Sequence, residues 1–265
     1  MRPLRYHRPQ SLAEALAMFT PDARYIAGGQ TLLPALKLRL AAPADLVDVA
    51  RLPELQGIAA TADTVTVGGG VSHYAVAGSD VVRRAIPALA ELAGSIGDPA
   101  VRHLGTIGGS LANNDPAADY PAAVLALGAV IHTDCRQIAA ADFFRGLFAT
   151  ALADGEIVTR VVFPVPAKAA YRKLRNLASG YALAGTFVAR MPNGEPRVGV
   201  TGAGSGGVFR ATAMEGALAR NWSAAALADI AVDPATLLAD IHATADYRAN
   251  LVAVMARRAV TVLSA

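Results

Sequence analysis

The chain has 265 residues, of which 54% are apolar, 17% are charged and one is a cysteine, and its formal net charge is +3. That length suits one large domain or two to three small ones. A single cysteine excludes an internal disulfide framework, and it excludes a self-contained iron–sulfur cluster, which usually takes about four thiolates.

Neither a membrane nor a nucleic acid suits this composition as a partner. Stretches without a charged residue, such as 120–133 and 176–189, are all shorter than the roughly 20 apolar residues of a membrane helix. The N-terminus contains prolines and a glutamate rather than an apolar run, so we expect no secretory signal. Basic residues are scattered, whereas a nucleic-acid surface needs them clustered with stacking aromatic residues. We therefore expect a cytoplasmic protein with no membrane span.

The first 55 residues predict two helices and two strands around a glycine loop. Ser11 and Glu14 have the spacing of a capping box at a helix start, and Pro34 suits the first turn of a second helix. The predicted elements are a helix over 12–19, a strand over 24–27, a tight loop at Gly28–Gly29, a helix over 32–40 and a strand over 45–49.

The middle of the chain has a different pattern of predicted elements, with strands at its two ends and short helices between them. The segment 95–119 is rich in Gly, Asn and Asp and is predicted to be a loop. Pro164 and Pro166 close the last strand and mark the second boundary between domains. The other predicted elements are strands over 64–67 and 156–163 and helices over 81–86, 87–93 and 121–127.

Beyond Pro166 the pattern predicts strands followed by helices, which is typical of an α+β domain with helices on an antiparallel sheet. A hairpin turn at 192–194 joins the two central strands. The predicted elements are strands over 171–175, 182–189 and 197–201 and helices over 211–220, 223–230 and 247–263. We expect an α+β fold with domains over 1–55, 56–166 and 167–265.

The segment 27–34, Ala-Gly-Gly-Gln-Thr-Leu-Leu-Pro, is the first candidate binding loop. A glycine pair between a strand and a helix lets backbone amides converge, and the helix N-terminus adds partial positive charge, so the loop suits a pyrophosphate. An ordinary glycine turn is the alternative, and spacing alone favours it. The loop is not a P-loop, because no Gly-Lys-Ser/Thr follows.

The segments 97–110 and 113–119 form the second candidate, a run of turn-forming residues. Thr106, Ser110 and Asp119 are suited to ribose and phosphate oxygens. Asp115 and Asp119 are alternatively paired carboxylates, but no His or Cys cluster accompanies them, so we expect no metal site. His103 is expected to be an ordinary hydrogen-bonded loop residue.

The segment 202–207 matches the dinucleotide pattern Gly-x-Gly-x-x-Gly and is nevertheless a poor candidate. That fingerprint requires a following strand with an acidic residue about 20 positions on, within a parallel βαβ unit. Only helices are predicted after Gly207, so a flexible turn is the better interpretation.

Long segments of the chain resemble the FAD-carrying medium subunits of molybdenum hydroxylases, which include carbon monoxide, aldehyde and N-heterocycle dehydrogenases and the related xanthine dehydrogenase. The resemblance covers essentially the whole chain in order, and it favours the cofactor interpretation of both glycine-rich loops. It implies a two-part PCMH-type FAD-binding domain followed by a C-terminal α+β domain. The segments that carry it are 25–40, 46–49, 96–112, 115–121, 202–210 and 240–248.

The resemblance also implies roles for individual residues. Loop 28–34 would wrap the pyrophosphate, Asp119 would lie toward the ribose or adenine end, and Tyr181 would lie beside the isoalloxazine. His103 and Asn113–Asn114 depart from the family's usual residues. The implied FAD-binding residues are Ala27, Gly28, Gly29, Gln30, Thr31, Leu32, Leu33, Pro34, Ile96, Thr106, Gly108, Gly109, Ser110, Asp119, Ile157, Val158, Lys173 and Tyr181.

The function implied by the resemblance is electron transfer. A small partner subunit would carry two [2Fe-2S] clusters and a large one the molybdenum cofactor, in a dimer of heterotrimers, and this chain would pass electrons from the clusters through FAD to NAD, a quinone or a cytochrome. Cys135 alone excludes the subclass with an extra cluster. We expect no catalytic acid or base on this chain, and its sequence does not encode the substrate. The alternatives are a stand-alone flavin oxidoreductase of the same fold and a scaffold that binds no flavin.

Overall fold

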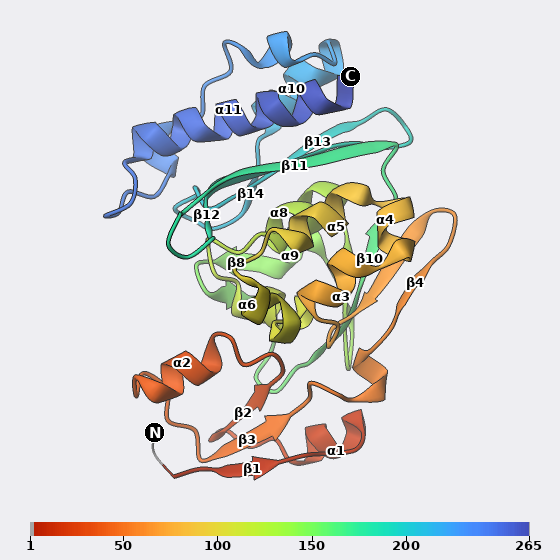
Figure 1. The fold of residues 1–265 in the computed structure, drawn as a ribbon, viewed down its shortest axis with the longest axis vertical. Helices are drawn as coiled ribbons and strands as arrows, with labels where there is room; N and C mark the ends of the chain where they lie inside the picture. Colours follow the sequence, from red (N-terminus) through yellow and green to blue (C-terminus); the bar gives the residue numbers. More distant parts are fainter. Residues whose placement is uncertain (1–2, 265) are drawn as a thin grey trace.

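The computed structural model describes residues 3–264, arranged as three stacked parts along one long axis (Figure 1). The N-terminal part is a parallel sheet in the order β1 (Arg5–His7), β3 (Asp45–Asp48) and β2 (Ala23–Ile26). Helices α1 (Leu12–Ala17) and α2 (Leu32–Lys37) connect its strands. The elements predicted for this part are therefore confirmed, and β1 is an additional strand.

Helix α1 begins as the capping pattern predicts, with one change of partner. The Ser11 hydroxyl accepts a hydrogen bond from the Glu14 amide at 3.2 Å. The Glu14 carboxylate accepts from the amide of Gln10 at 2.6 Å rather than from that of Ser11. Both side chains thus satisfy backbone amides around the helix start.

The middle part is a five-stranded antiparallel sheet covered by short helices. Its strand order is β4 (Ile58–Ala60), β5 (Thr64–Gly68), β10 (Val158–Pro164), β6 (Val130–Thr133) and β7 (Gln137–Ala139). The other elements are η1 (Pro53–Leu55), α3 (His73–Gly78), α4 (Asp80–Ala85), α5 (Pro87–Gly94), α6 (Pro99–Leu104), α7 (Ile107–Asn113), α8 (Tyr120–Leu127), α9 (Ala140–Phe143), β8 (Phe144–Gly146) and β9 (Ala149–Thr150).

The prediction that 95–119 is a loop is wrong, because this segment contains α6 and α7. The Asp98 carboxylate accepts from the Val101 amide at 2.8 Å and the Thr106 hydroxyl from the Gly109 amide at 3.1 Å, so each helix has a side-chain N-cap. Asn114 ends α7 in the left-handed conformation, with φ at 44°. Turn-forming residues therefore serve here as caps of two short helices.

The C-terminal part is the antiparallel sheet β11 (Lys168–Arg175), β12 (Ala182–Arg190), β13 (Pro196–Thr201) and β14 (Phe209–Arg210). Helices α10 (Thr212–Arg220) and α11 (Ala245–Ser264) pack on one face of it, and α5 and α8 on the other. Phe187 belongs to the middle core, and its neighbour Val188 to the core under α11. This alternation along β12 lets one sheet serve two hydrophobic cores.

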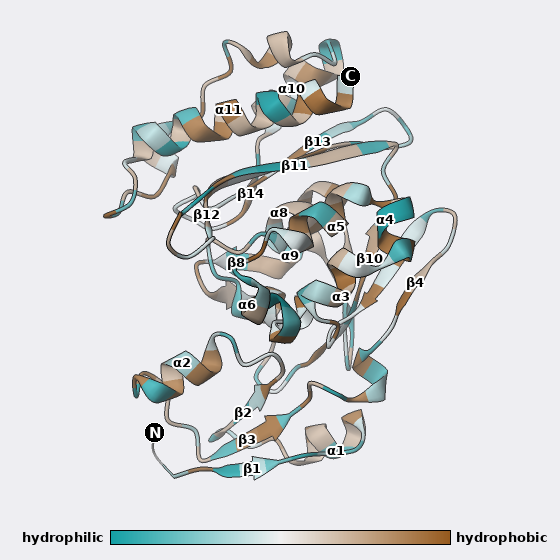
Figure 2. Ribbon diagram, viewed as in Figure 1, coloured by the Kyte–Doolittle hydropathy of each residue, from teal (hydrophilic) through white to brown (hydrophobic). Residues whose placement is uncertain are grey.

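The remaining predictions for this part are mostly correct. The helix predicted over 223–230 is wrong, since only the 3₁₀ turns η2 (Ala224–Leu227) and, further on, η3 (Pro234–Thr236) are present. The Gly-x-Gly-x-x-Gly segment leads into β14 and α10 rather than into a parallel βαβ unit. Figure 2 shows apolar and hydrophilic residues mixed along α11, whose buried residues Leu251, Val252 and Ala256 face the sheet. No helix in the described part of the chain is long and apolar enough to cross a membrane.

Candidate functional site

A cleft of about 590 Å³ lies between the N-terminal part and the helices of the middle part. Two sets of residues form most of its walls, one from β2 to the start of α2 and the other from the loops around α6 and α7. Twelve of the predicted site residues line it: Ala27, Gly28, Gly29, Gln30, Thr31, Leu32, Ile96, Thr106, Gly109, Ser110, Asp119 and Tyr181. The fold therefore brings the two glycine-rich segments face to face, although 70 residues separate them in sequence.

The first loop presents a row of backbone amides without partners. Among residues 3–264, no acceptor receives a hydrogen bond from the amides of 28–32, and the first amide of this turn with a partner is that of Leu33, bonded to the Gly29 carbonyl. Gly29 has φ at +68°, which a glycine adopts without strain. Thr31 makes no side-chain cap. Unpaired amides at the start of a helix form a site for a phosphate group.

Gly28 joins the two walls of the cleft by close backbone contact. A Cβ at this position would lie 2.3 Å from the Leu104 carbonyl oxygen and 2.6 Å from the Gly105 Cα. Any side chain would therefore push the amide row away from the opposite wall. The glycine is required here by this contact.

The second segment offers side chains rather than amides. The amides of 107–110 already donate to Val71, Gly69 and Thr106. Thr106 and Ser110 line the cleft, and the Thr106 hydroxyl also accepts from the Gly109 amide. Gly108 does not line the cleft, since a Cβ on it would meet the Gly69 carbonyl oxygen at 2.6 Å, so its place in the structure is a packing contact.

Asp119 lies at the far wall in a buried polar network. Its carboxylate accepts from the Lys173 ammonium at 2.8 Å and from the Tyr171 hydroxyl at 2.6 Å. Burial raises the pKa of the Asp119 carboxyl above its usual value, and the Lys173 ammonium and the Tyr171 hydroxyl oppose that rise. The network ties the cleft wall to strand β11 of the C-terminal part.

Lys173 reaches the cleft only through Asp119. Its ammonium also donates to the carbonyls of Ser95 and Gly180 at 3.0 Å each, so its three donors are occupied. It is not among the residues that line the cleft, and neither are Leu33 and Pro34. Direct contact of these three residues with a cofactor stays a prediction, and the geometry gives Lys173 a supporting place.

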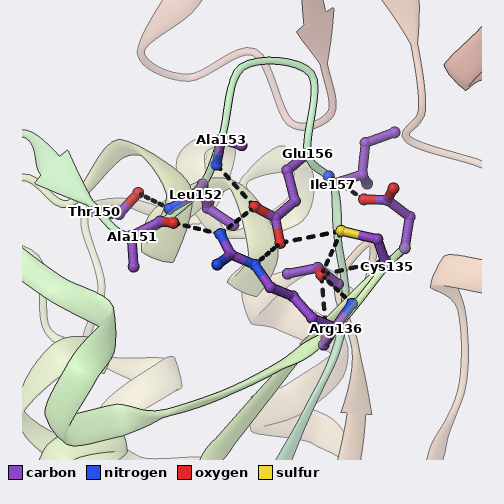
Figure 3. Close-up of polar contacts among 10 residues, drawn as sticks. Cys135, Arg136, Thr150, Ala151, Leu152, Ala153, Glu156 and Ile157 are labelled. Atoms are coloured by element: carbon purple, nitrogen blue, oxygen red, sulfur yellow. Dashed lines mark hydrogen bonds and ion pairs between the residues drawn. The ribbon is translucent and has the colours of Figure 1, made fainter.

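Ile157 and Val158 also lie behind the cleft wall, both about 5% exposed. The Ile157 amide donates to the Asp134 carboxylate at 2.7 Å. Beside it, Arg136 forms a two-pronged ion pair with Glu156 at 2.7–2.8 Å, next to the exposed Cys135 (Figure 3). Their predicted contact with FAD is likewise untested, and what the geometry shows is a fixed turn leading into β10.

Arg248 joins the two C-terminal motifs to each other and to strand β12. Its guanidinium is 3% exposed and donates to the carbonyls of Leu183 and Gly202 at 2.5 Å each and to Asp240 at 2.7 Å. These bonds join the segment 202–207 and the segment 240–248 to the start of β12, directly after Tyr181. The two motifs therefore hold the strand that presents Tyr181 to the cleft.

Sequence reasoning missed several residues of the cleft. His73 is the one with distinctive chemistry, because it is buried and burial lowers its pKa to about 4. A lone histidine after a glycine-rich strand end carries no sequence signal for such a place. The other lining residues outside the implied FAD-binding set are Arg24, Tyr25, Ile26, Ala35, Val101, Gly105, Ala112, Asn113, Asp115 and Ala118, of which Val101, Gly105, Asn113, Asp115 and Ala118 lie in the predicted second segment.

The donor set suits a dinucleotide with a pyrophosphate, since amides without partners face hydroxyls and a buried acid across an elongated cleft. These features define a chain that is built to bind a dinucleotide. The chain belongs to the family described as the FAD binding domain in molybdopterin dehydrogenase, which matches residues 2–166.

Particular relatives are similar over nearly their whole length. The carbon monoxide dehydrogenase medium chain of Afipia carboxidovorans is 36% identical, with 96% of this chain and 94% of that one covered. The nicotine 6-hydroxylase medium subunit of Paenarthrobacter nicotinovorans is 32% identical, with 97% and 96% covered. The structure of reconstituted CO dehydrogenase from Oligotropha carboxidovorans matches with a TM-score of 0.89 at 34% identity, covering 98% of each chain. The predicted α+β fold and the predicted family are thus confirmed.

Proposed function

We propose that this chain is the FAD-carrying electron-transfer subunit of a heteromeric molybdenum hydroxylase of the carbon monoxide dehydrogenase type, located in the cytoplasm. Its partners would be a small subunit with [2Fe-2S] clusters and a large subunit with the molybdenum cofactor. Bound FAD would supply the ability to take up electrons singly and release two to an external acceptor. The observation that carries the proposal is the row of unpaired amides at 28–32.

The residues of this chain would hold and orient the cofactor. The amides of the first loop would bind the pyrophosphate, and the Thr106 and Ser110 hydroxyls would bind oxygens on the opposite side. Asp119 would accept from ribose or adenine donors, fixed in place by Lys173. Tyr181 would cover the flavin end from the C-terminal part. No described group of three or more His, Cys, Asp or Glu side chains could hold a metal ion.

The relatives support a division of labour between subunits. Medium chains of similar length belong to enzymes named for carbon monoxide and for nicotine. We infer that the substrate binds to another subunit, because enzymes named for different substrates have medium chains of similar length. We also propose domains over 1–55, 56–166 and 167–265, which the three larger sheets, one in each range, support.

The test is flavin content and co-purification with the full chain. We expect the protein to take up one FAD and, from its native source, to co-purify with an iron–sulfur and a molybdenum subunit. A chain that takes up no FAD contradicts the proposal, and a flavoprotein that never associates with such subunits favours a stand-alone flavin oxidoreductase.

A pair of glycine variants tests the loop itself. We expect Gly29→Val to abolish FAD retention, because its φ of +68° excludes a branched side chain and a Cβ would lie 2.9 Å from Leu33. The matched control is Gly78→Ala at the end of α3, where a Cβ meets nothing within 4 Å. Normal flavin content in Gly29→Val would refute the assignment of the loop.

A further inference from the structure

His73 is a buried polar group of the cleft that the predicted set of FAD contacts does not include. It follows the Ser72 N-cap of α3, its backbone amide donates to the Gly105 carbonyl at 2.9 Å, and its side chain is 5% exposed. It lines the cleft together with Gly105. The hydrogen bond between the His73 amide and the Gly105 carbonyl therefore fixes the position of this residue.

The ring of His73 has no hydrogen-bond partner among residues 3–264. Its Nδ1 is fully buried and unpaired. Its Nε2 lies over Gly105, within 2.6 Å of where a Cβ on that residue would be. The hydroxyl of Tyr120, whose ring centre lies 5.4 Å away, is also buried and unpaired. Two such groups beside each other are uncommon, because buried polar atoms normally have partners.

Gly105 connects His73 to the amide row of 28–32. Gly105 Cα lies 2.6 Å from where a Cβ on Gly28 would be, so His73, Gly105 and Gly28 form a continuous stack. Gly105 therefore contacts both residues, and His73 and Gly28 line the same cleft. Burial, assisted by the nearby Arg102 charge, lowers the pKa of His73 to about 4, so the ring is neutral near pH 7 with one nitrogen as donor.

We propose that His73 is a further cofactor-holding residue, whose Nε2–H donates a hydrogen bond to a pyrophosphate oxygen bound at the amides of 28–32. The assignment rests on the proposed FAD function of the cleft. The ligand chemistry is an anionic oxygen, for which a charge-assisted hydrogen bond is favourable.

The test compares three ligands on the full chain freed of flavin. FAD and ADP-ribose both contain the pyrophosphate, whereas riboflavin contains only the flavin end. We expect His73→Phe, which keeps an aromatic ring beside Tyr120, to weaken FAD and ADP-ribose about tenfold or more and to leave riboflavin unchanged. We expect His73→Gln, whose amide nitrogen reaches close to the place of Nε2, to recover most of the affinity.

Two further measurements keep the result interpretable. His103→Phe is the matched control, because this ring stacks on Tyr74 with centres 4.0 Å apart and does not line the cleft. In wild-type protein with ¹⁵N-labelled histidine, the His73 Nε2 resonance is expected to shift on ADP-ribose binding, and this readout does not depend on how a variant folds.

The outcomes separate the two claims. If the wild-type chain binds FAD and ADP-ribose but His73→Phe binds them equally well, or if the Nε2 resonance does not move, the assignment of His73 is wrong and the FAD function stands. Weakening of riboflavin alone would also overturn it, since the contact would then be at the flavin end. If the wild-type chain binds neither FAD nor ADP-ribose, the proposed function itself is wrong.

Discussion

The buried pair of Asp119 and Lys173 allows a sharp test of how the C-terminal part supports the cleft. The two side chains are 1% and 6% exposed, and Lys173 also bonds the carbonyls of Ser95 and Gly180. Lys173→Met keeps the length of the side chain and removes the charge and three hydrogen bonds. Breaking a buried pair on one side typically destabilises by about 3–5 kcal/mol, because the remaining charge is left uncompensated. We expect a loss of that size in the free energy of unfolding at pH 7.

The pH dependence of this loss follows from the direction of the pKa shift. Burial already raises the pKa of Asp119, and removal of the ammonium that opposes it raises that pKa further. A carboxyl whose pKa is higher in the folded state stabilises that state at low pH and loses this contribution as pH rises. The deficit of Lys173→Met is therefore expected to be smaller at pH 5 than at pH 7.

The assay is urea denaturation of the full chain, followed by circular dichroism at both pH values. Lys168→Met on the same strand is the control, because its exposed ammonium bonds only a carbonyl near the C-terminal end, and we expect a change within about 0.5 kcal/mol. Addition of Asp119→Asn to Lys173→Met should restore part of the loss, since no buried charge remains. Strictly additive effects of the two substitutions, or a deficit that grows at pH 5, would refute this reasoning.

Three other outcomes follow from single positions. Gly28→Ala is expected to lower stability by about 1–3 kcal/mol and FAD affinity by more than tenfold, measured by denaturation and flavin titration, since its Cβ would lie 2.3 Å from the Leu104 carbonyl oxygen. Asn114→Ala is expected to lose about 2–3 kcal/mol through the left-handed φ of 44° and two lost bonds at 2.8 Å, with Asn114→Gly recovering about 1 kcal/mol in the same unfolding assay. His73 has a folded pKa of about 4 against 6.5 unfolded, so it makes stability fall by about 3 kcal/mol as pH drops from 6.5 to 4, and a pH series of unfolding free energies for His73→Phe should lack that part of the slope.

The sequence predicts most of the regular elements because their signals are local. Leu12–Ala17 has its capping residues beside it, and the hairpin of β12 and β13 has its turn at 192–194. Helices α6 and α7 escaped prediction because Gly, Asn and Asp indicate a loop by composition, while their caps depend on specific side-chain bonds. β6 and β7 form a short hairpin, and the pairing of β6 with the distant strand β10 has no local signal.

The features of the site also fall into two groups: those that the local sequence predicts and those that depend on contacts between distant segments. The glycine pair at 28–29 permits a loop of free amides, which the family resemblance favours over an ordinary turn, and the structure has unpaired amides there. That Gly28 lies against Leu104 depends on packing between parts 76 residues apart, which no spacing in the sequence encodes. His73 was missed for this reason, as its burial and its unpaired nitrogens arise only when α3 packs beside Gly105 and Tyr120.

The arrangement explains why a chain with so little acid–base chemistry of its own needs three parts. The amides of the first part are the proposed phosphate site, the helices of the middle part carry Asp119, and β11 of the last part supplies Lys173 to hold that carboxylate. Arg248 fixes the start of β12 and so the position of Tyr181. Each part leaves a polar group that only another part, or the cofactor, can satisfy. The proposed cofactor site is therefore complete only when the three parts are packed together.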